Sequence, residues 1–331
     1  MRELDAIASA GCGVGRWACA RCRSTFTVLI ATVLLVAVST ACSGSGRDVD
    51  FSKAESSPES VPNFSSQAAP VRIAVAPVLS AKTTSSLYQQ LAAYISGKLG
   101  RPVELVQGKT YAEINDMLKS GDVTVALVCT NPYLQGKDDF GMELIAAPEI
   151  RGELVYHSLL IVNRTSRATS LNDLRGTSFA FSDPLSNTGR LAPVYQLALR
   201  GTNPDSYFSQ TIFTYSHDSS IRAVADGVVT AAAVDSLVFD YLASTEPSLI
   251  EKVKVVERWG PFGINPLVVN PHLDAETKLE LQRVFLGMNK DAEGLVILKN
   301  LQIDRFVIPE DSLYDSVREM RAYLRQRGLT P

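Results

Sequence analysis

Short apolar runs alternate with helical spacing through the first part of the folded chain. Residues 71–76 form one such run and are typical of a buried strand. Apolar side chains then recur at four-residue intervals from Leu87 to Leu99, which predicts a helix that ends at Gly100. The pattern repeats, with strands predicted over 103–106 and 123–129 and a helix over 111–119. This order predicts a parallel sheet covered by helices.

The loops that follow these strands should meet at one edge of the sheet. Right-handed crossovers return the chain in the same direction each time, so the carboxyl ends of the strands lie together. The loops are 76–80, 107–110 and 130–133. Ligands of open α/β sheets bind at this edge.

A second series of strands and helices is nested within the first. A long strand predicted over 154–163 and a short helix over 170–176 lead into it. The second series has strands over 177–181, 211–215 and 230–234 and helices from about 188 to 200 and over 219–226, and strands over 253–257 and 266–270 return the chain. Two amphipathic helices, around Leu281 and Val317, close the chain and need a sheet to cover. We therefore expect an α/β fold of two lobes, with the chain crossing between them near 163–170 and 258–265. The ligand cleft would lie between the lobes.

The N-terminal segment has the pattern of a secretory signal. Arginines precede an uncharged apolar run over 26–38, which is too short to span a bilayer comfortably. Residues 38–42, Val-Ser-Thr-Ala-Cys, resemble a bacterial lipobox, in which the signal is cleaved before a cysteine that then carries a lipid. An ordinary cleaved signal and an uncleaved anchor are the alternatives. Cys42 is the predicted lipidation site of a protein outside the cytoplasm.

These patterns divide the chain into four parts. Residues 1–41 are the predicted lipoprotein signal peptide, and 42–70, rich in Ser, Gly, Pro and acidic residues, form a predicted flexible tether. The expected first lobe comprises 71–165 and 262–331, and the expected second lobe comprises 166–261.

Composition and charge narrow the classes of function. The 331 residues are 46% hydrophobic and 20% charged, with a net charge of −3, which gives no reason to expect a nucleic-acid partner. Three of the five cysteines lie in the signal segment, and Cys42 is the fourth. Only Cys129 remains in the body, so no intramolecular disulfide is available to it.

The stretch from Phe179 to Gly201 carries the strongest candidate chemistry. A short apolar strand breaks at the turn dipeptide Asp-Pro, and Ser186, Asn187 and Thr188 follow in a row at the start of a predicted helix. Hydroxyls, unpaired backbone N–H groups and the helix dipole then point to one place, which predicts an anion site. An ordinary helix N-cap is the alternative.

Three motifs in this order resemble the phosphate/phosphite/phosphonate-binding proteins of bacterial ABC transporters. They are Phe-Ser-Asp-Pro-Leu-Ser-Asn-Thr-Gly-Arg-Leu-Ala-Pro over 181–193, Ser-His-Asp-Ser-Ser-Ile-Arg-Ala-Val-Ala-Asp-Gly over 216–227, and Ala-Ala-Ala-Val-Asp-Ser over 231–236. The resemblance covers the body from about Val71 onward. It implies the type II periplasmic-binding-protein fold, in which two lobes close on a ligand.

The resemblance implies donors for an oxyanion. In the family the Asp-Pro turn holds the anion through hydroxyls and helix-end N–H groups, which here are carried by Ser186, Asn187 and Thr188. The histidine of the Ser-His-Asp turn, here His217, supplies a further donor. Asp218 beside it is expected to cap a helix.

The other half of the pocket departs from the family pattern. Members that bind aminoalkyl phosphonates pair the ammonium group with carboxylates, which align with Asp235 and with Asn265. Only the first is acidic here, and a buried ammonium without its anionic partners is costly. Phosphate, phosphite or a small alkylphosphonate is therefore favoured. Tyr133 and Tyr156 are candidate aromatic walls, with an ordinary core position as the alternative.

Cys129 supports a second hypothesis. It ends a buried strand at the expected cleft, where a cysteine is usually a small hydrophobic residue. Some similar proteins that feed sensor kinases, including arsenite-binding ones, use a cysteine there. A soft thiolate would suit such a ligand.

An enzyme and a metal site are both disfavoured. Ser186, His217 and Asp235 are the residue types of a catalytic triad, but the Gly-x-Ser-x-Gly elbow is absent. His157 and His272 lie outside the motifs, so metal ligands are too few, and no cofactor is expected. We therefore expect a monomeric, lipid-anchored solute-binding protein that docks on an ABC transporter permease, with a sensor for a histidine kinase as the alternative.

Overall fold

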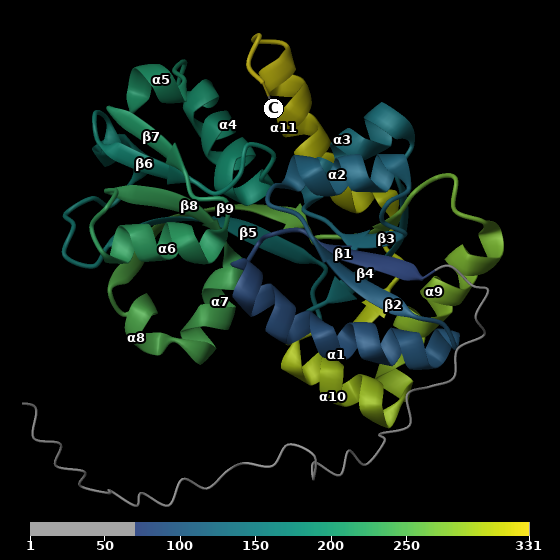
Figure 1. Ribbon diagram of the computed structural model, residues 1–331. Helices are drawn as coiled ribbons and strands as arrows, with labels where there is room; N and C mark the ends of the chain where they lie inside the picture. Colours follow the sequence, from purple (N-terminus) through teal and green to yellow (C-terminus); the bar gives the residue numbers. More distant parts are fainter. Residues whose placement is uncertain (1–69, 331) are drawn as a thin grey trace, which may run out of the picture. The chain divides into compact units, whose positions relative to one another are not determined.

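The computed structural model describes residues 70–330 (Figure 1). The predicted signal peptide, the tether up to residue 69 and Cys42 lie outside the described residues. Among the described helices, none combines the length and the apolar character that a membrane crossing requires.

The first of two mixed sheets has the strand order β11-β4-β10-β3-β1-β2. Its parallel strands are β1 (Val71–Val75), β2 (Val103–Gln107) and β3 (Val125–Leu127). The antiparallel strands are β4 (Glu143–Glu149), β10 (Leu267–Val269) and β11 (Arg305–Val307). The parallel core confirms the predicted strand–helix–strand unit, while β4 and β11 were not predicted.

Helices pack on both faces of this sheet. One face is covered by α1 (Ala81–Leu99), α9 (Ala275–Gly287) and α10 (Ala292–Asn300), through a core that includes Ile95, Phe285 and Ile297. The other face holds α2 (Tyr111–Ser120) and α3 (Thr130–Phe140), while α11 (Asp315–Arg325) packs against α3 and against elements of the second sheet. Two short turns, η4 (Met288–Lys290) and η5 (Asp311–Tyr314), complete the C-terminal part.

The second sheet has the order β7-β6-β8-β5-β9. Its strands are β5 (Val155–Asn163), β6 (Ser178–Phe181), β7 (Gln210–Phe213), β8 (Ala231–Asp235) and β9 (Val253–Gly263). One face packs on α6 (His217–Ala225), α7 (Ser236–Thr245) and α8 (Pro247–Ile250). The other packs on η2 (Leu171–Leu174), the turn η3 (Asn187–Leu191), α4 (Ala192–Leu199) and α5 (Pro204–Tyr207).

Two features differ from the sequence prediction. β5 pairs antiparallel with β8 and β9, so this strand belongs to the second sheet, whereas the predicted boundary at residue 165 assigned it to the first lobe. The chain therefore passes between the sheets at 150–154 and again at 264–266. The apolar run of β5 is typical of a strand buried on both faces, which could lie at the centre of either sheet. Its sequence pattern does not indicate which strands pair with it.

The segment 130–133 was predicted as a loop but forms the first turn of α3. Pro132 lies where a helix has no need of a backbone N–H, because the first N–H groups of a helix have no partner in it. The Asn-Pro dipeptide at 131–132 is typical both of a turn and of the first turn of a helix, so the sequence alone does not distinguish them.

Candidate functional site

The turn after β6 presents the predicted donors from a buried position. Ser186 caps η3, and its Oγ accepts a hydrogen bond from the Gly189 N–H at 3.0 Å. η3 is a π-helical turn, in which the Leu191 N–H donates to the Ser186 carbonyl, and it continues directly into α4. Ser186, Asn187 and Thr188 are all fully buried. The predicted helix start is therefore real, but the wider turn places three polar side chains in the interior.

Gly189 allows this turn to pack against its surroundings. A Cβ at this position would lie 1.8 Å from Ser182 Oγ and 3.0 Å from His217 Cε1. Real Cβ atoms do not approach other atoms so closely, so a side chain here would displace the histidine or the turn. The backbone of Gly189 is not in the left-handed region. Glycine is therefore required here by the close contacts with neighbouring atoms, and not by the backbone conformation.

His217 is the first residue of α6 and lies beside this turn. Its Nδ1 accepts a hydrogen bond from the Asp235 N–H at 3.1 Å, so the ring proton resides on Nε2. Nε2 lies 3.4 Å from Ser186 Oγ. Burial lowers the pKa of the imidazole to about 3, so the ring is neutral at physiological pH. The structure thus holds His217 as a neutral N–H donor.

Asp235 ends β8 and caps α7. Its carboxylate accepts the Leu237 N–H at 2.7 Å, and burial raises its pKa to about 7. The predicted cap Asp218 has a different role. Ser216 caps α6, while Asp218 accepts the Ser80 N–H at 3.0 Å.

The catalytic-triad arrangement is not formed, although its three residue types are brought together. The backbone of Asp235, and not its carboxylate, contacts His217 Nδ1. A histidine with its proton on Nε2 donates towards Ser186 and cannot remove the hydroxyl proton. In the part of the chain that the structure describes, no group of three or more His, Cys, Asp or Glu side chains could hold a metal ion.

Cys129 and Tyr156 contact the same turn. The Asn187 N–H donates to Cys129 Sγ at 3.4 Å, and Asn187 Nδ2 donates to Tyr156 Oη at 3.1 Å. Tyr156 Oη lies 3.7 Å from Cys129 Sγ and donates to Thr130 Oγ1 at 3.3 Å. Burial raises the pKa of the thiol to about 11, which keeps it protonated. Residues from both sheets therefore meet at Asn187.

Sequence reasoning missed Tyr111, the first residue of α2. Its N–H donates to Asp183 Oδ2 at 3.1 Å, and its ring packs against Ala76 and Cys129. Burial is the main cause that holds its hydroxyl pKa well above the ordinary value, while the nearby Ser186 hydroxyl acts in the opposite direction. The available signal was its place directly after the loop 107–110, at the sheet edge where ligands bind.

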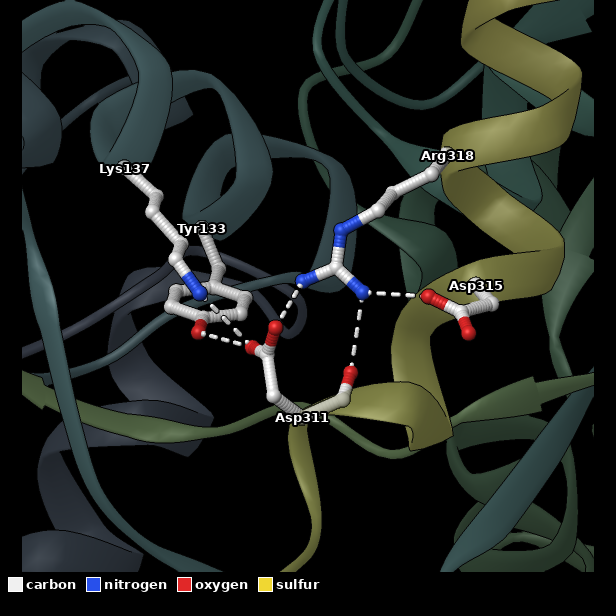
Figure 2. A network of polar contacts seen from close by, with 5 residues as sticks. All are labelled: Tyr133, Lys137, Asp311, Asp315 and Arg318. Carbon is white, nitrogen blue, oxygen red and sulfur yellow. Dashed lines mark hydrogen bonds and ion pairs between the residues drawn. The ribbon is translucent and has the colours of Figure 1, made fainter.

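Tyr133 and Asn265 lie outside the group of contacting residues described above, which is called the donor cluster from here on. Its members are Tyr111, Cys129, Tyr156, Ser186, Asn187, Thr188, His217 and Asp235. Figure 2 shows Tyr133 within a polar network, where its hydroxyl donates to Asp311 Oδ1 at 3.0 Å. Its ring packs edge-on against Tyr314, with centroids 5.1 Å apart. Asn265, between β9 and β10, lines a separate apolar pocket.

Three buried polar atoms of the cluster have no hydrogen-bond partner within residues 70–330. They are Tyr111 Oη, Asn187 Oδ1 and Thr188 Oγ1. A buried polar atom without a partner costs about 1–3 kcal/mol. Together with the Nε2–H of His217, the two hydroxyls form a neutral set that can donate to an anion, whereas Asn187 Oδ1 is an acceptor and cannot do so in this orientation.

Comparisons with known proteins identify the family of this chain. The family model described as "ABC transporter, phosphonate, periplasmic substrate-binding protein" matches residues 73–314. The chain belongs to this family. Members of this family are the substrate-binding proteins of transporters.

Individual members of the phosphonate-binding family are related at low identity. The phosphonates-binding periplasmic protein of Escherichia coli is 25% identical over 237 residues, which cover 70% of each chain. A probable phosphite-binding ABC transporter protein of Prochlorococcus marinus is 25% identical over 185 residues, 52% of this chain and 60% of that protein.

Solved structures confirm the predicted type II periplasmic-binding-protein fold. A binding-protein component of an ABC phosphonate transporter from Pseudomonas aeruginosa superimposes with a TM-score of 0.74 at 24% identity, covering 78% of this chain and 87% of that one. PhnD1 of Prochlorococcus marinus, in complex with methylphosphonate, gives 0.71 at 19% identity, covering 78% and 98%.

Proposed function

We propose that this substrate-binding protein captures a small phosphorus oxyanion and delivers it to an ABC importer. The anion would be phosphate, phosphite or an alkylphosphonate. The donors would be the side chains of Ser186, Asn187, Thr188 and His217, joined by Tyr111. The observation that carries the proposal is the meeting of buried polar atoms without partners around a neutral Nε2–H donor.

The donor set suits a tetrahedral oxyanion. Ser186 Oγ already accepts from the Gly189 N–H, so its own proton remains available to donate. The Asn187 amide can present Nδ2 to the anion if Oδ1 instead accepts the Tyr156 hydroxyl proton, which Thr130 Oγ1 then no longer receives. Hydrogen bonds to a charged group are shorter and stronger than neutral ones, so an uncharged donor set can still bind an anion well.

The alternative, an arsenite sensor, receives less support from the same residues. It requires Cys129 as a thiolate, but the thiol has a pKa of about 11 and accepts the Asn187 N–H. We therefore assign Cys129 a packing role next to the anion.

The test is a calorimetric titration of phosphate, phosphite and methylphosphonate into the purified chain. Losing one hydrogen bond to a charged group costs roughly 1.5–3 kcal/mol. Thr188→Ala should therefore weaken binding by about one to two orders of magnitude, while Thr188→Ser should restore most of it. Thr165→Ala, at an exposed position, is the matched control. Unchanged affinity in Thr188→Ala would remove the turn from the site.

The lipid anchor is a separate part of the proposal. It rests on the lipobox-like residues 38–42 and the family's place outside the cytoplasm. Cys42→Ala should release the chain from the membrane fraction of a bacterial host. A variant that stays fully membrane-bound would contradict lipidation at Cys42.

A further inference from the structure

An apolar cavity of about 120 Å³ lies beside the donor cluster. Its lining comes from the loop after β1, the end of β3, the start of α7, the link between β9 and β10, and also from α1, β4 with Ile150 after it, and the segment after α10. The described residues that line it include no Asp, Glu, Lys, Arg or His. Its polar groups are the hydroxyls of Tyr88 and Tyr241 and the amide of Asn265.

Four chain segments run directly from the donor cluster into this cavity. Ala76 lines it and also packs against Tyr111 and Cys129. Val128 immediately precedes Cys129 and lines it too. The lining segment 237–238 follows Asp235, whose N–H bonds His217. The lining segment 264–265 follows Gly263, whose carbonyl accepts the Thr130 hydroxyl.

Two hydrogen bonds fix these segments to the cluster. The Val78 carbonyl accepts the His217 N–H at 3.0 Å, and the Gly263 carbonyl accepts the Thr130 hydroxyl at 2.6 Å. Because Val78 itself lines the cavity, the wall of the cavity is hydrogen-bonded directly to the first residue of α6, His217. The cavity and the donor cluster therefore lie on two sides of the same short segments, of which Ala76 and Val78 are part.

We propose that this cavity holds the substituent of the ligand, and that the ligand is a phosphonate with an uncharged, apolar substituent. The inference rests on the proposed function, because the donors must first hold the phosphonate oxygens. An apolar cavity of ~150 Å³ accommodates benzene, so about 120 Å³ suits roughly four to six carbons. A charged ammonium would lose its hydration here without a carboxylate among the lining residues to replace it.

The experiment compares n-butylphosphonate with methylphosphonate and aminoethylphosphonate on the full chain, purified in mild detergent and followed by calorimetry. Each buried methylene strengthens binding about three- to fourfold, so butylphosphonate should bind about 30-fold more tightly than methylphosphonate. Aminoethylphosphonate should bind more weakly than butylphosphonate.

Two variants fill the cavity from positions outside the donor segments. Ile150→Trp and Leu301→Trp change half-buried lining residues on β4's side of the cavity and after α10. Each should abolish the advantage of butylphosphonate and leave methylphosphonate affinity within about twofold of the unsubstituted chain, since the donors are untouched. Using both guards against one variant failing to fold.

The outcomes separate this inference from the proposed function. Tight binding of methylphosphonate with no gain for butylphosphonate would overturn the cavity assignment alone. An equal loss of methyl- and butylphosphonate affinity in both variants would also overturn it. Binding of none of the phosphonates would overturn the proposed function together with the inference built on it.

Discussion

In the donor cluster, a hydrogen bond to one polar atom of a side chain fixes that side chain and leaves its remaining proton available to donate. The Asp235 N–H fixes the His217 tautomer, and the Gly189 N–H leaves the Ser186 proton available. In the proposed function, neutral groups therefore supply the donors to the anion. Their arrangement depends on close contacts that tolerate no added atom.

Gly189→Ala should damage the site more than its size suggests. The new Cβ would overlap Ser182 Oγ and press on His217, and overpacking of this kind costs about 1–3 kcal/mol. We expect a lower unfolding free energy by urea titration and a loss of ligand affinity of at least about tenfold, because the imidazole must move.

Gly97→Ala in α1 is the matched control. A Cβ there would meet no atom within 4 Å, so the change should stabilise the helix by about 0.5–1 kcal/mol. If the two substitutions behaved alike, the contacts of Gly189 would not explain its presence in the motif.

Among the elements, α11 is linked to the ligand turn through α3. Arg321 is 5% exposed and donates to Asn131 Oδ1 at 2.5 Å and to Asp138 Oδ2 at 3.1 Å. Asn131 in turn donates from Nδ2 to the Leu185 carbonyl, next to Ser186. The network in Figure 2, where Arg318 bonds Asp311, anchors the start of the same helix. The C-terminal helix therefore helps to position the turn, through Asn131 and through its own contact with η3.

Arg321→Ala should destabilise the protein by about 1–3 kcal/mol, because Asn131 would lose a buried partner. Ligand affinity should fall as well, since Asn131 would no longer be held against Leu185. Arg325→Ala is the control, because Arg325 contacts Asp138 from a position where its side chain is 55% exposed. Exposed pairs contribute ~0–1 kcal/mol. Urea unfolding and calorimetry would contradict this view if both variants lost equal stability.

The elements also show what the sequence could predict. Periodicity located β1, α1, β2 and α2, because each has an apolar face of regular spacing and a clear stop such as Gly100 or Gly121. It misplaced β5, whose partners come from distant parts of the chain. Motifs identified Ser186 and His217, but Tyr111 and the network of Tyr133 depend on contacts between segments that no local pattern records.

At the scale of the whole molecule, bonds join the two sheets around the cluster. The Thr130 hydroxyl donates to the Gly263 carbonyl at 2.6 Å, and Asn187 contacts both Cys129 and Tyr156. An anion bound to the native state alone would stabilise that state by mass action. Protonation of the cluster should alter the same equilibrium.

Two buried groups of the cluster should make opposite contributions to the pH dependence of stability. His217 has a pKa of about 3 in the folded state and about 6.5 when unfolded, so its contribution is complete above pH 6.5 and is lost as the pH falls towards 3. Asp235 has a folded pKa of about 7 against 3.8, so its contribution is complete below pH 3.8 and is lost as the pH rises towards 7. Between these limits the two contributions oppose each other.

Urea unfolding between pH 4 and pH 6.5 should therefore separate the two groups. Relative to the unsubstituted chain, His217→Gln should lose stability as the pH rises, because it lacks the stability that His217 gains over this range. Asp235→Asn should gain relative stability over the same range, because it lacks the stability that Asp235 loses. Each full proton corresponds to about 1.4 kcal/mol per pH unit, and subtracting the unsubstituted curve cancels the groups that the substitutions leave alone. Two flat difference curves would show that these groups ionise in the folded protein as they do in water, and would remove burial as the origin of the neutral donor set.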